Sequence, residues 1–196
     1  MKLYPIQCGN FKLDGGAMFG VVPKSLWERT NPADSKNLIE LGTRSLLVED
    51  GKKLILIDCG LGNKQDEKFF GHYSLYGDES LDKNLKKFGF VREDITDVFL
   101  THLHFDHCGG AIEWNDDKTG YRPAFKNAQF WTNENHWQWA TEPNPREKAS
   151  FLKENILPMQ ESGQLQFLPT PKTGNYGFAP DLKMDVIFVD GHTEKQ

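Results

Sequence analysis

The chain has 196 residues, of which 38% are hydrophobic and 26% charged, and this composition fits one globular domain rather than a disordered tail or a fibre. A net charge of −5 offers no electrostatic footprint for a nucleic acid, and no apolar run approaches the roughly 18 residues of a membrane span. Three widely spaced cysteines, an odd number, are typical of reduced thiols in a cytosolic protein. We therefore expect a single cytoplasmic domain over residues 1–196 with no nucleic-acid or membrane partner.

The first part of the chain contains a glycine-rich stretch and a hairpin pattern. The stretch 14–20 predicts an irregular loop that leads into an extended segment. The apolar runs 45–48 and 54–57 flank an Asp-Gly pair at 50–51, which readily takes the positive φ angles that a two-residue turn requires. The two runs therefore predict a β-hairpin whose second strand ends immediately before Asp58.

A short helix and a short strand are predicted next. Ser80 can cap a helix over 81–88, which Gly89 would end because glycine adopts the left-handed conformation at low cost. The apolar run 98–100 predicts a buried strand.

Two further helices and one strand are predicted downstream. Asn133 or Thr132 can cap a short helix. Asn144 with Pro145 starts a longer one through Leu157, because proline fits the first helical position. The run 186–189 predicts another buried strand. Strands and helices alternate, so the expected fold class is mixed α/β, or α+β by some schemes.

The strongest chemical signal lies directly after the strand predicted at 98–100. His102, His104, Asp106 and His107 form the pattern His-x-His-x-Asp-His, and a pair of glycines follows one residue later. In an extended segment alternate side chains face the same way, so the first two histidines can converge on one ion. A bend would aim the adjacent aspartate and histidine at a second point, which indicates two metals. The two glycines would let the backbone turn tightly beneath the site.

This motif resembles the metallo-β-lactamase superfamily of dinuclear metallohydrolases, because Asp58 ends an earlier apolar strand and Gly-His-Thr at 191–193 follows a later one. The stretch 14–23 and the spacing of 90 residues from His102 to His192 are most similar to the branch that contains N-acyl homoserine lactonases and methyl parathion hydrolase. The resemblance implies an αβ/βα sandwich with the metals at one edge of the sheets.

The resemblance also implies a set of metal ligands. Three imidazoles would bind the first metal, and a carboxylate with an imidazole would bind the second: His102, His104 and His192, then Asp106 and His107. Asp58 would be a carboxylate that orients a metal-bound imidazole. The family completes its site with a bridging aspartate and a final histidine, and the sequence ends before either. We therefore expect a fragment in which the second half of the sandwich is incomplete, the alternative being that these ligands are absent.

Other residues have interpretations that depend on the same resemblance. Asp106 is the carboxylate expected to act in catalysis, by protonating the leaving oxygen. Met18 and Phe19 would line a hydrophobic substrate pocket, with packing as the alternative. His72 and His136 lack a comparable context and are expected to be surface or packing residues.

The predicted function is that of a dinuclear metal-dependent hydrolase that uses a bridging hydroxide on a small molecule, a lactone or related ester. Zinc is the expected metal, and manganese, iron or cobalt also suit such a site. Three alternatives remain: a phosphotriesterase or phosphodiesterase of the same fold, a redox di-iron protein of the same fold, and an inactive metal-binding fragment. The redox branch carries a glutamate where His104 stands, which argues against it. The substrate and the oligomeric state stay open.

Overall fold

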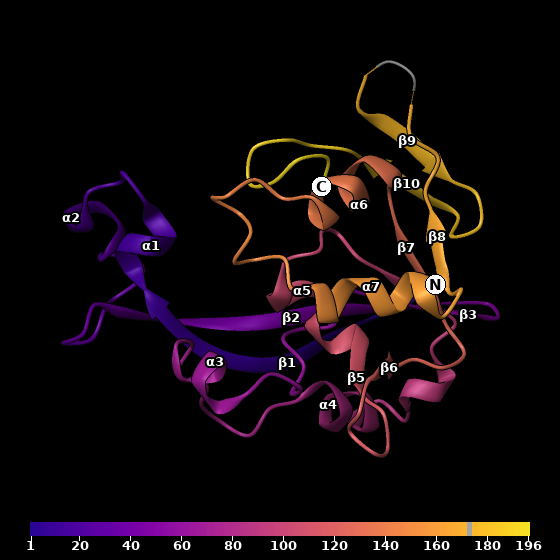
Figure 1. The fold of residues 1–196 in the computed structure, drawn as a ribbon, viewed down its shortest axis with the longest axis horizontal. Helices are drawn as coiled ribbons and strands as arrows, with labels where there is room; N and C mark the ends of the chain where they lie inside the picture. Colours follow the sequence, from indigo (N-terminus) through magenta and orange to yellow (C-terminus); the bar gives the residue numbers. More distant parts are fainter. Residues whose placement is uncertain (172–173) are drawn as a thin grey trace.

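The computed structural model describes residues 1–171 and 174–196 and contains short helices around one large sheet (Figure 1). The mixed α/β class is confirmed. The helices are α1 Gly15–Phe19, α2 Lys24–Trp27, α3 Glu67–Gly71, α4 Leu81–Lys87, α5 Phe105–Cys108, α6 Glu134–Thr141 and α7 Lys153–Glu161, with single 3-10 turns at Arg92–Asp94 and Gly109–Ala111. The strands are β1 Lys2–Asp14, β2 Leu38–Asp50, β3 Lys53–Ile57, β4 Asp97–Phe99, β5 Ile112–Trp114, β6 Tyr121–Pro123, β7 Gln129–Thr132, β8 Leu165–Phe167, β9 Tyr176–Ala179 and β10 Met184–Ile187.

The large sheet brings distant parts of the sequence to one edge. Its strand order is β1-β2-β3-β4-β7-β8; the first three strands are antiparallel, and β3, β4, β7 and β8 run parallel. The carboxyl ends of parallel strands meet at the same edge of a sheet. Asp58 follows β3, His102 comes three residues after β4, and Asn133 follows β7, so these side chains share that edge.

The hairpin between β2 and β3 forms as its sequence predicts. Asp50 pairs with Lys53 in the antiparallel register, and Gly51 has a φ of 62°, which glycine adopts without strain. Alternate residues of the two strands and of their parallel neighbours face a core that contains Leu47, Leu54, Leu56, Val98 and Phe130. This core fixes the ends of the strands that carry the site.

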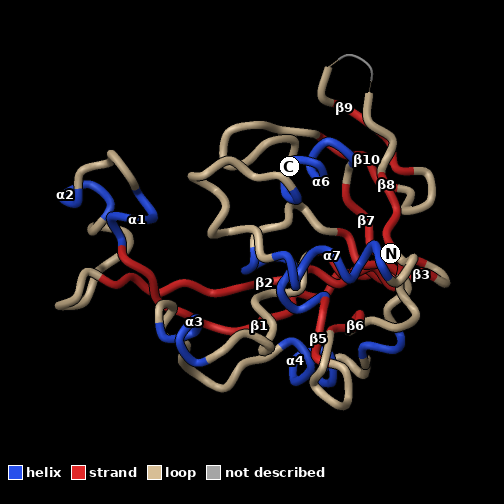
Figure 2. The backbone as a smooth tube through the Cα atoms, in the orientation of Figure 1, coloured by secondary structure: helices blue, strands red, loops and turns tan. Residues whose placement is uncertain are grey.

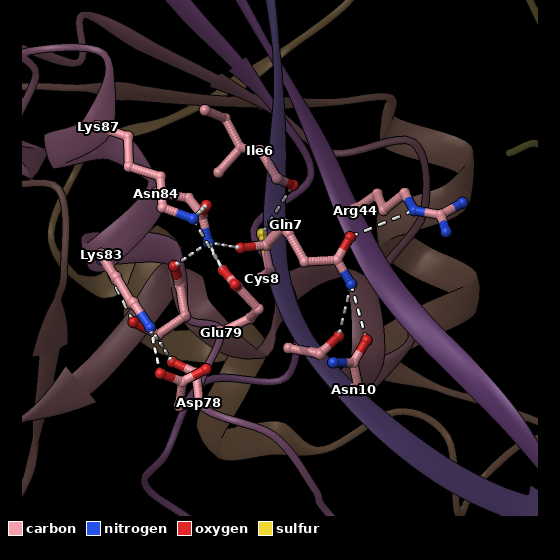
Figure 3. Close-up of polar contacts among 12 residues, drawn as sticks. Ile6, Gln7, Cys8, Asn10, Arg44, Asp78, Glu79, Lys83, Asn84 and Lys87 are labelled. Atoms are coloured by element: carbon pink, nitrogen blue, oxygen red, sulfur yellow. Dashed lines mark hydrogen bonds and ion pairs between the residues drawn. The ribbon is translucent and has the colours of Figure 1, made fainter.

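Helix α4 is tied to the sheet by a buried amide. Ser80 accepts a hydrogen bond from the backbone of Lys83, and Gly89 has a φ of 85°, so both predicted ends of this helix are confirmed. Asn84, which is 5% exposed, donates to the carbonyl of Gln7 in β1 at 2.7 Å and to the Glu79 carboxylate at 2.5 Å (Figure 3). The helix therefore covers one face of β1.

The prediction of an irregular loop at 14–20 is wrong, because this stretch forms α1. The Asp14 carboxylate caps the helix by accepting from the backbone N–H of Ala17 at 2.9 Å. Trp27 of α2 packs so closely over Gly15 that an added Cβ would lie 2.4 Å from its ring. Capping and this contact outweigh the low helix propensity of glycine. The two helices form an arm at the far end of the β1–β2 hairpin (Figure 1).

Two downstream elements also differ from their prediction. Asn144 and Pro145 do not start a long helix, because the Asn144 side chain accepts from the N–H groups of Arg146 and Glu147 in a turn, and α7 begins only at Lys153. The strand predicted at 186–189 is the exposed hairpin strand β10, which pairs only with β9 within the described residues. None of the helices in the described ranges is long and apolar enough to cross a membrane.

Candidate metal centre

Three imidazoles gather at the carboxyl edge of the parallel strands. His102 and His104 lie in the loop after β4, His192 lies in the segment after β10, and one nitrogen of each ring is within 4.8 Å of the others. The ring centroids are 4.7 to 5.1 Å apart, and Nδ1 of His104 is 3.2 Å from Nε2 of His192. Two nitrogens bound to one tetrahedral zinc would be roughly 3.3 Å apart. The spacing of the rings therefore fits one ion.

Two of these rings present a nitrogen that lacks a partner among the described residues. Nε2 of His102 and Nε2 of His104 are buried and make no hydrogen bond. Leaving a buried polar atom unpaired costs about 1 to 3 kcal/mol. A bound cation would remove this cost for Nε2 of His102, whereas His104 faces His192 with its other nitrogen, Nδ1. Burial and the neighbouring His107 lower the pKa of His102 to about 2, and burial and His192 lower the pKa of His104 to about 4. Both rings are therefore neutral at pH 7, the form in which imidazole binds metals.

Asp58 forms hydrogen bonds with the segment that carries the imidazoles. Its carboxylate accepts hydrogen bonds from the Thr101 hydroxyl at 2.9 Å and from Nδ1 of His107 at 2.8 Å. Because the hydroxyl donates to Asp58, it can only accept from Nδ1 of His102, which lies 3.1 Å away. Both rings then carry their proton on Nδ1 and offer the lone pair of Nε2. The structure places Asp58 where its predicted orienting role requires it, and that role stays a prediction.

The second pair of predicted ligands lies beside the first group. Asp106 Oδ2 is 3.5 Å from Nε2 of His107, and the rings of His107 and His102 are 4.0 Å apart between centroids. Burial disfavours the charged form of His107, but the hydrogen bond to Asp58 and the charge of Asp106 outweigh burial and raise the pKa of His107. The two side chains therefore face one point next to the three imidazoles, and their metal binding stays a prediction.

The glycine pair after Cys108 leaves room for the backbone of a neighbouring loop. It does not form the tight turn that the sequence predicts. Gly109 is helical, with a φ of −57°. An added Cβ on Gly109 would lie 2.1 Å from the carbonyl oxygen of Leu61, and one on Gly110 would lie 2.1 Å from that of Cys59. The loop that contains Asp58 therefore packs directly against the end of α5.

A buried lysine also contacts the end of α5, and its titration predicts a measurable dependence of stability on pH. Lys64 is 4% exposed and donates to the carbonyl of Gly109 at 2.5 Å. Burial lowers its pKa from 10.5 to about 8. Between these two values the unfolded chain holds a proton that the folded chain has released, so the contribution of this group to stability rises with pH, by on the order of 3 kcal/mol in full.

We expect urea unfolding at pH 7.5, 9 and 10 to show this rise as a difference between the wild type and Lys64→Met. Titrating groups that do not interact with Lys64 are present in both proteins and drop out of the difference. If the unfolding free energies of the wild type and of Lys64→Met change by the same amount between pH 7.5 and pH 10, the expectation is contradicted.

The sequence interpretation missed His136, which lies at the centre of the site's hydrogen bonding. It is fully buried, its Nε2 accepts from the backbone N–H of Leu103 at 2.9 Å, and its Nδ1 lies 2.6 Å from the carbonyl oxygen of Glu194. Asn133, the confirmed cap of α6, also donates to the carbonyl of Lys195 at 2.6 Å. The signal that could have found His136 is its position in the first turn of a helix that follows a buried strand.

The structure places Met18 and Phe19 on the arm instead of beside the histidines. Met18 is 47% exposed, and Phe19 stacks on Trp27 with the centroids 5.1 Å apart. A cavity of about 510 Å³ borders the imidazoles, and its lining residues within the described chain are Thr101, His102, His107, Ile187, Val189, His192 and Gln196. A pocket role for the two arm residues stays a prediction.

Comparison with known proteins identifies the family. Residues 38–175 match the family model described as the Metallo-beta-lactamase superfamily. This match covers more than half of the chain, and the chain belongs to that superfamily. The resemblance inferred from the histidine motif is thereby confirmed.

Individual relatives point to hydrolases. A probable metal-dependent hydrolase from Staphylococcus aureus is 28% identical, with a TM-score of 0.82, and the match covers 100% of this chain and 66% of that one. An N-acyl homoserine lactonase from Bacillus cereus is 22% identical over 98% of this chain and 66% of its own length. A dizinc quorum-quenching lactonase, solved with a product, is 24% identical with a TM-score of 0.65 over 91% of this chain and 63% of that chain, which shows the fold alone. The chain thus spans about two thirds of the length of these relatives.

Proposed function

We propose that the protein is a metal-dependent hydrolase that opens a lactone or cleaves a related ester. The observation that carries the proposal is the convergence of three ring nitrogens within 4.8 Å of one another, on His102, His104 and His192, with Nε2 of His102 buried and unpartnered among the described residues. The lactonases among the similar proteins support a lactone as the substrate class. The predictions of a single domain over 1–196 and of a cytoplasmic location are kept as part of this proposal.

The metal group proposed is a pair of divalent ions, with zinc preferred. His102, His104 and His192 would hold one ion, and Asp106 with His107 would contribute to the other. When bound, such ions would lower the pKa of a water between them and polarise the scissile bond, which supplies the nucleophile near neutral pH.

The protein residues orient these ligands and handle the proton. Asp58 accepts a hydrogen bond directly from Nδ1 of His107. It also accepts from the Thr101 hydroxyl, which in turn accepts from Nδ1 of His102. Both contacts leave the Nε2 lone pair of the ring available. We propose that the Asp106 carboxylate takes the proton that the attacking water releases and passes it to the leaving oxygen. The apolar side chains of Ile187 and Val189, which line the cavity, would contact the apolar part of a substrate.

The test compares an N-acyl lactone with an aryl phosphotriester in the full-length protein, before and after removal of metal with a chelator. We expect lactone hydrolysis that is lost with the metal and restored by zinc. Faster hydrolysis of the phosphotriester would favour the alternative substrate class. A metal-loaded protein that hydrolyses neither would contradict the proposal, and an iron-oxo absorbance would favour the redox alternative.

A further inference from the structure

We propose that His136 is a positioning residue that holds the two metal-binding segments in register through its two ring nitrogens. The inference rests on the proposed metal site. It adds to that site a residue of α6, an element that carries none of the ligands.

His136 joins backbone from both segments. Its Nε2 accepts from the N–H of Leu103, the residue between His102 and His104, at 2.9 Å. Its Nδ1 lies 2.6 Å from the carbonyl oxygen of Glu194, two residues after His192. Because a carbonyl oxygen only accepts, Nδ1 carries the proton and donates it, while Nε2 is unprotonated. We call these two hydrogen bonds, from Leu103 to His136 and from His136 to Glu194, the bridge.

The position of this ring is itself fixed. His136 is fully buried, its own N–H donates to the cap residue Asn133 at 2.8 Å, and its ring lies 5.9 Å from that of Phe151, measured between centroids. Phe151 also packs against the ring of His104 at 4.7 Å. The bridge is therefore anchored to α6, whereas the segment after β10 has an exposed His192 and little regular structure of its own (Figure 2).

The bridge has a direct consequence for the metal site. The segment 188–196 forms no strand or helix, so the distance of His192 from the other two rings depends on such tertiary bonds. Metal sites require donor atoms held close to their final geometry. Loss of the bridge would let His192 move away and would weaken binding to the three imidazoles.

Two substitutions separate the halves of the bridge. The side-chain oxygen of His136→Gln reaches the place of Nε2 and can still accept from Leu103, whereas the amide nitrogen of His136→Asn lies near the place of Nδ1 and can still donate to Glu194. His136→Leu removes both bonds. The matched control is Ala140→Gly, which weakens the same helix at a buried position by about 1 kcal/mol without touching the bridge.

The experiment measures cobalt binding to the full-length protein by calorimetry and by the visible spectrum of the bound ion. We expect His136→Leu to weaken binding by roughly 10- to 100-fold, the range found for residues that support metal ligands, and to alter the spectrum. The Gln and Asn variants should fall between His136→Leu and the wild type. Ala140→Gly should bind as the wild type does.

A second measurement does not depend on how the variants fold. Two-bond ¹H–¹⁵N spectra of the wild-type imidazoles should show His136 with its proton on Nδ1. The opposite tautomer would overturn the bridge, and so would cobalt binding by His136→Leu with wild-type affinity and spectrum. A wild-type protein that binds no cobalt would instead overturn the proposed function, and this inference with it.

Discussion

Replacement of His102 by alanine is expected to remove the ion proposed for the three imidazoles and hydrolase activity together. The substitution deletes one of three imidazoles whose nitrogens lie within 4.8 Å of one another. Even residues that only hydrogen-bond to a ligand cost roughly 10- to 100-fold in metal affinity, so loss of a ligand should exceed about 100-fold. His104→Ala should give the same result for the same reason.

Metal content after dialysis and thermal unfolding with added zinc measure this effect. An ion that binds only the folded protein stabilises it by about 2.7 kcal/mol at one hundred times its dissociation constant. The wild type should therefore unfold at a higher temperature when zinc is added, and His102→Ala should show a smaller rise, because only the pair of Asp106 and His107 remains intact. The matched control is His72→Ala, which removes an exposed imidazole and should respond as the wild type does. Retention of both metal and activity in His102→Ala would refute the ligand assignment.

The sequence predicts the part of the site that depends on the types of side chain and on their spacing. The residues at 102–107 are close in sequence and of metal-binding types, so their pattern alone indicates the chemistry. The apolar run before Asp58 predicts its position at the end of a strand, and its orienting role comes from the resemblance. The ligand role of His192 came from the resemblance, and the structure brings its ring to the other two.

The part that was missed depends on backbone atoms. His136 bonds to the N–H of Leu103 and the carbonyl of Glu194, groups that every residue except proline provides, so no pattern of residue types marks its partners. The same holds for Lys64, which bonds to the carbonyl of Gly109. Such partners become visible only when the strand order has placed the segments side by side.

The errors in the predicted elements have a related cause. Local signals favoured a loop at the glycines of 14–20 and a helix at Pro145, and in both places a side-chain oxygen decided otherwise. Asp14 caps a helix over the glycines, and Asn144 binds two backbone N–H groups in a turn instead of starting a helix. The backbone carbonyl of Ser150, at the end of that turn, accepts from the N–H of Phe105 within the motif. Local hydrogen bonds from side chains to the backbone thus overrode weak propensities.

Replacement of Asp58 by asparagine is the second substitution with a large expected effect, and it should cost the protein one of two bound ions. The carboxylate accepts from His107 Nδ1 at 2.8 Å, whereas the amide nitrogen of asparagine can only donate. The backbone N–H of Thr101 donates to the other oxygen of the carboxylate at 2.9 Å, so the amide oxygen of asparagine is needed there and its amide nitrogen faces His107. The ring of His107 then places its proton on Nε2, which blocks the lone pair that a metal would use. Metal content should fall from two ions towards one per chain, with activity reduced by roughly 10- to 100-fold or more.

Asparagine is the suitable replacement because of the backbone at this position. Asp58 has a φ of 57°, in the left-handed region that asparagine tolerates and that costs most other residues roughly 1 to 2 kcal/mol. A loss of metal in Asp58→Asn is therefore an effect of the hydrogen bond and not of strain. The control is Asp97→Asn, in the neighbouring strand β4, whose 1% exposed carboxylate bonds to Lys53 and Trp131 and to none of the imidazoles. It should lower stability and leave metal content unchanged.

A third variant separates the two effects of the same carboxylate. Thr101→Val keeps the shape of the side chain but removes the hydroxyl that links Asp58 to Nδ1 of His102. The direct bond from His107 remains, so this variant should weaken binding at the three imidazoles and spare the pair of Asp106 and His107, the opposite of the main effect of Asp58→Asn. Two ions retained at wild-type affinity in Asp58→Asn would show that Asp58 supports the loop alone and does not determine the tautomers of the rings.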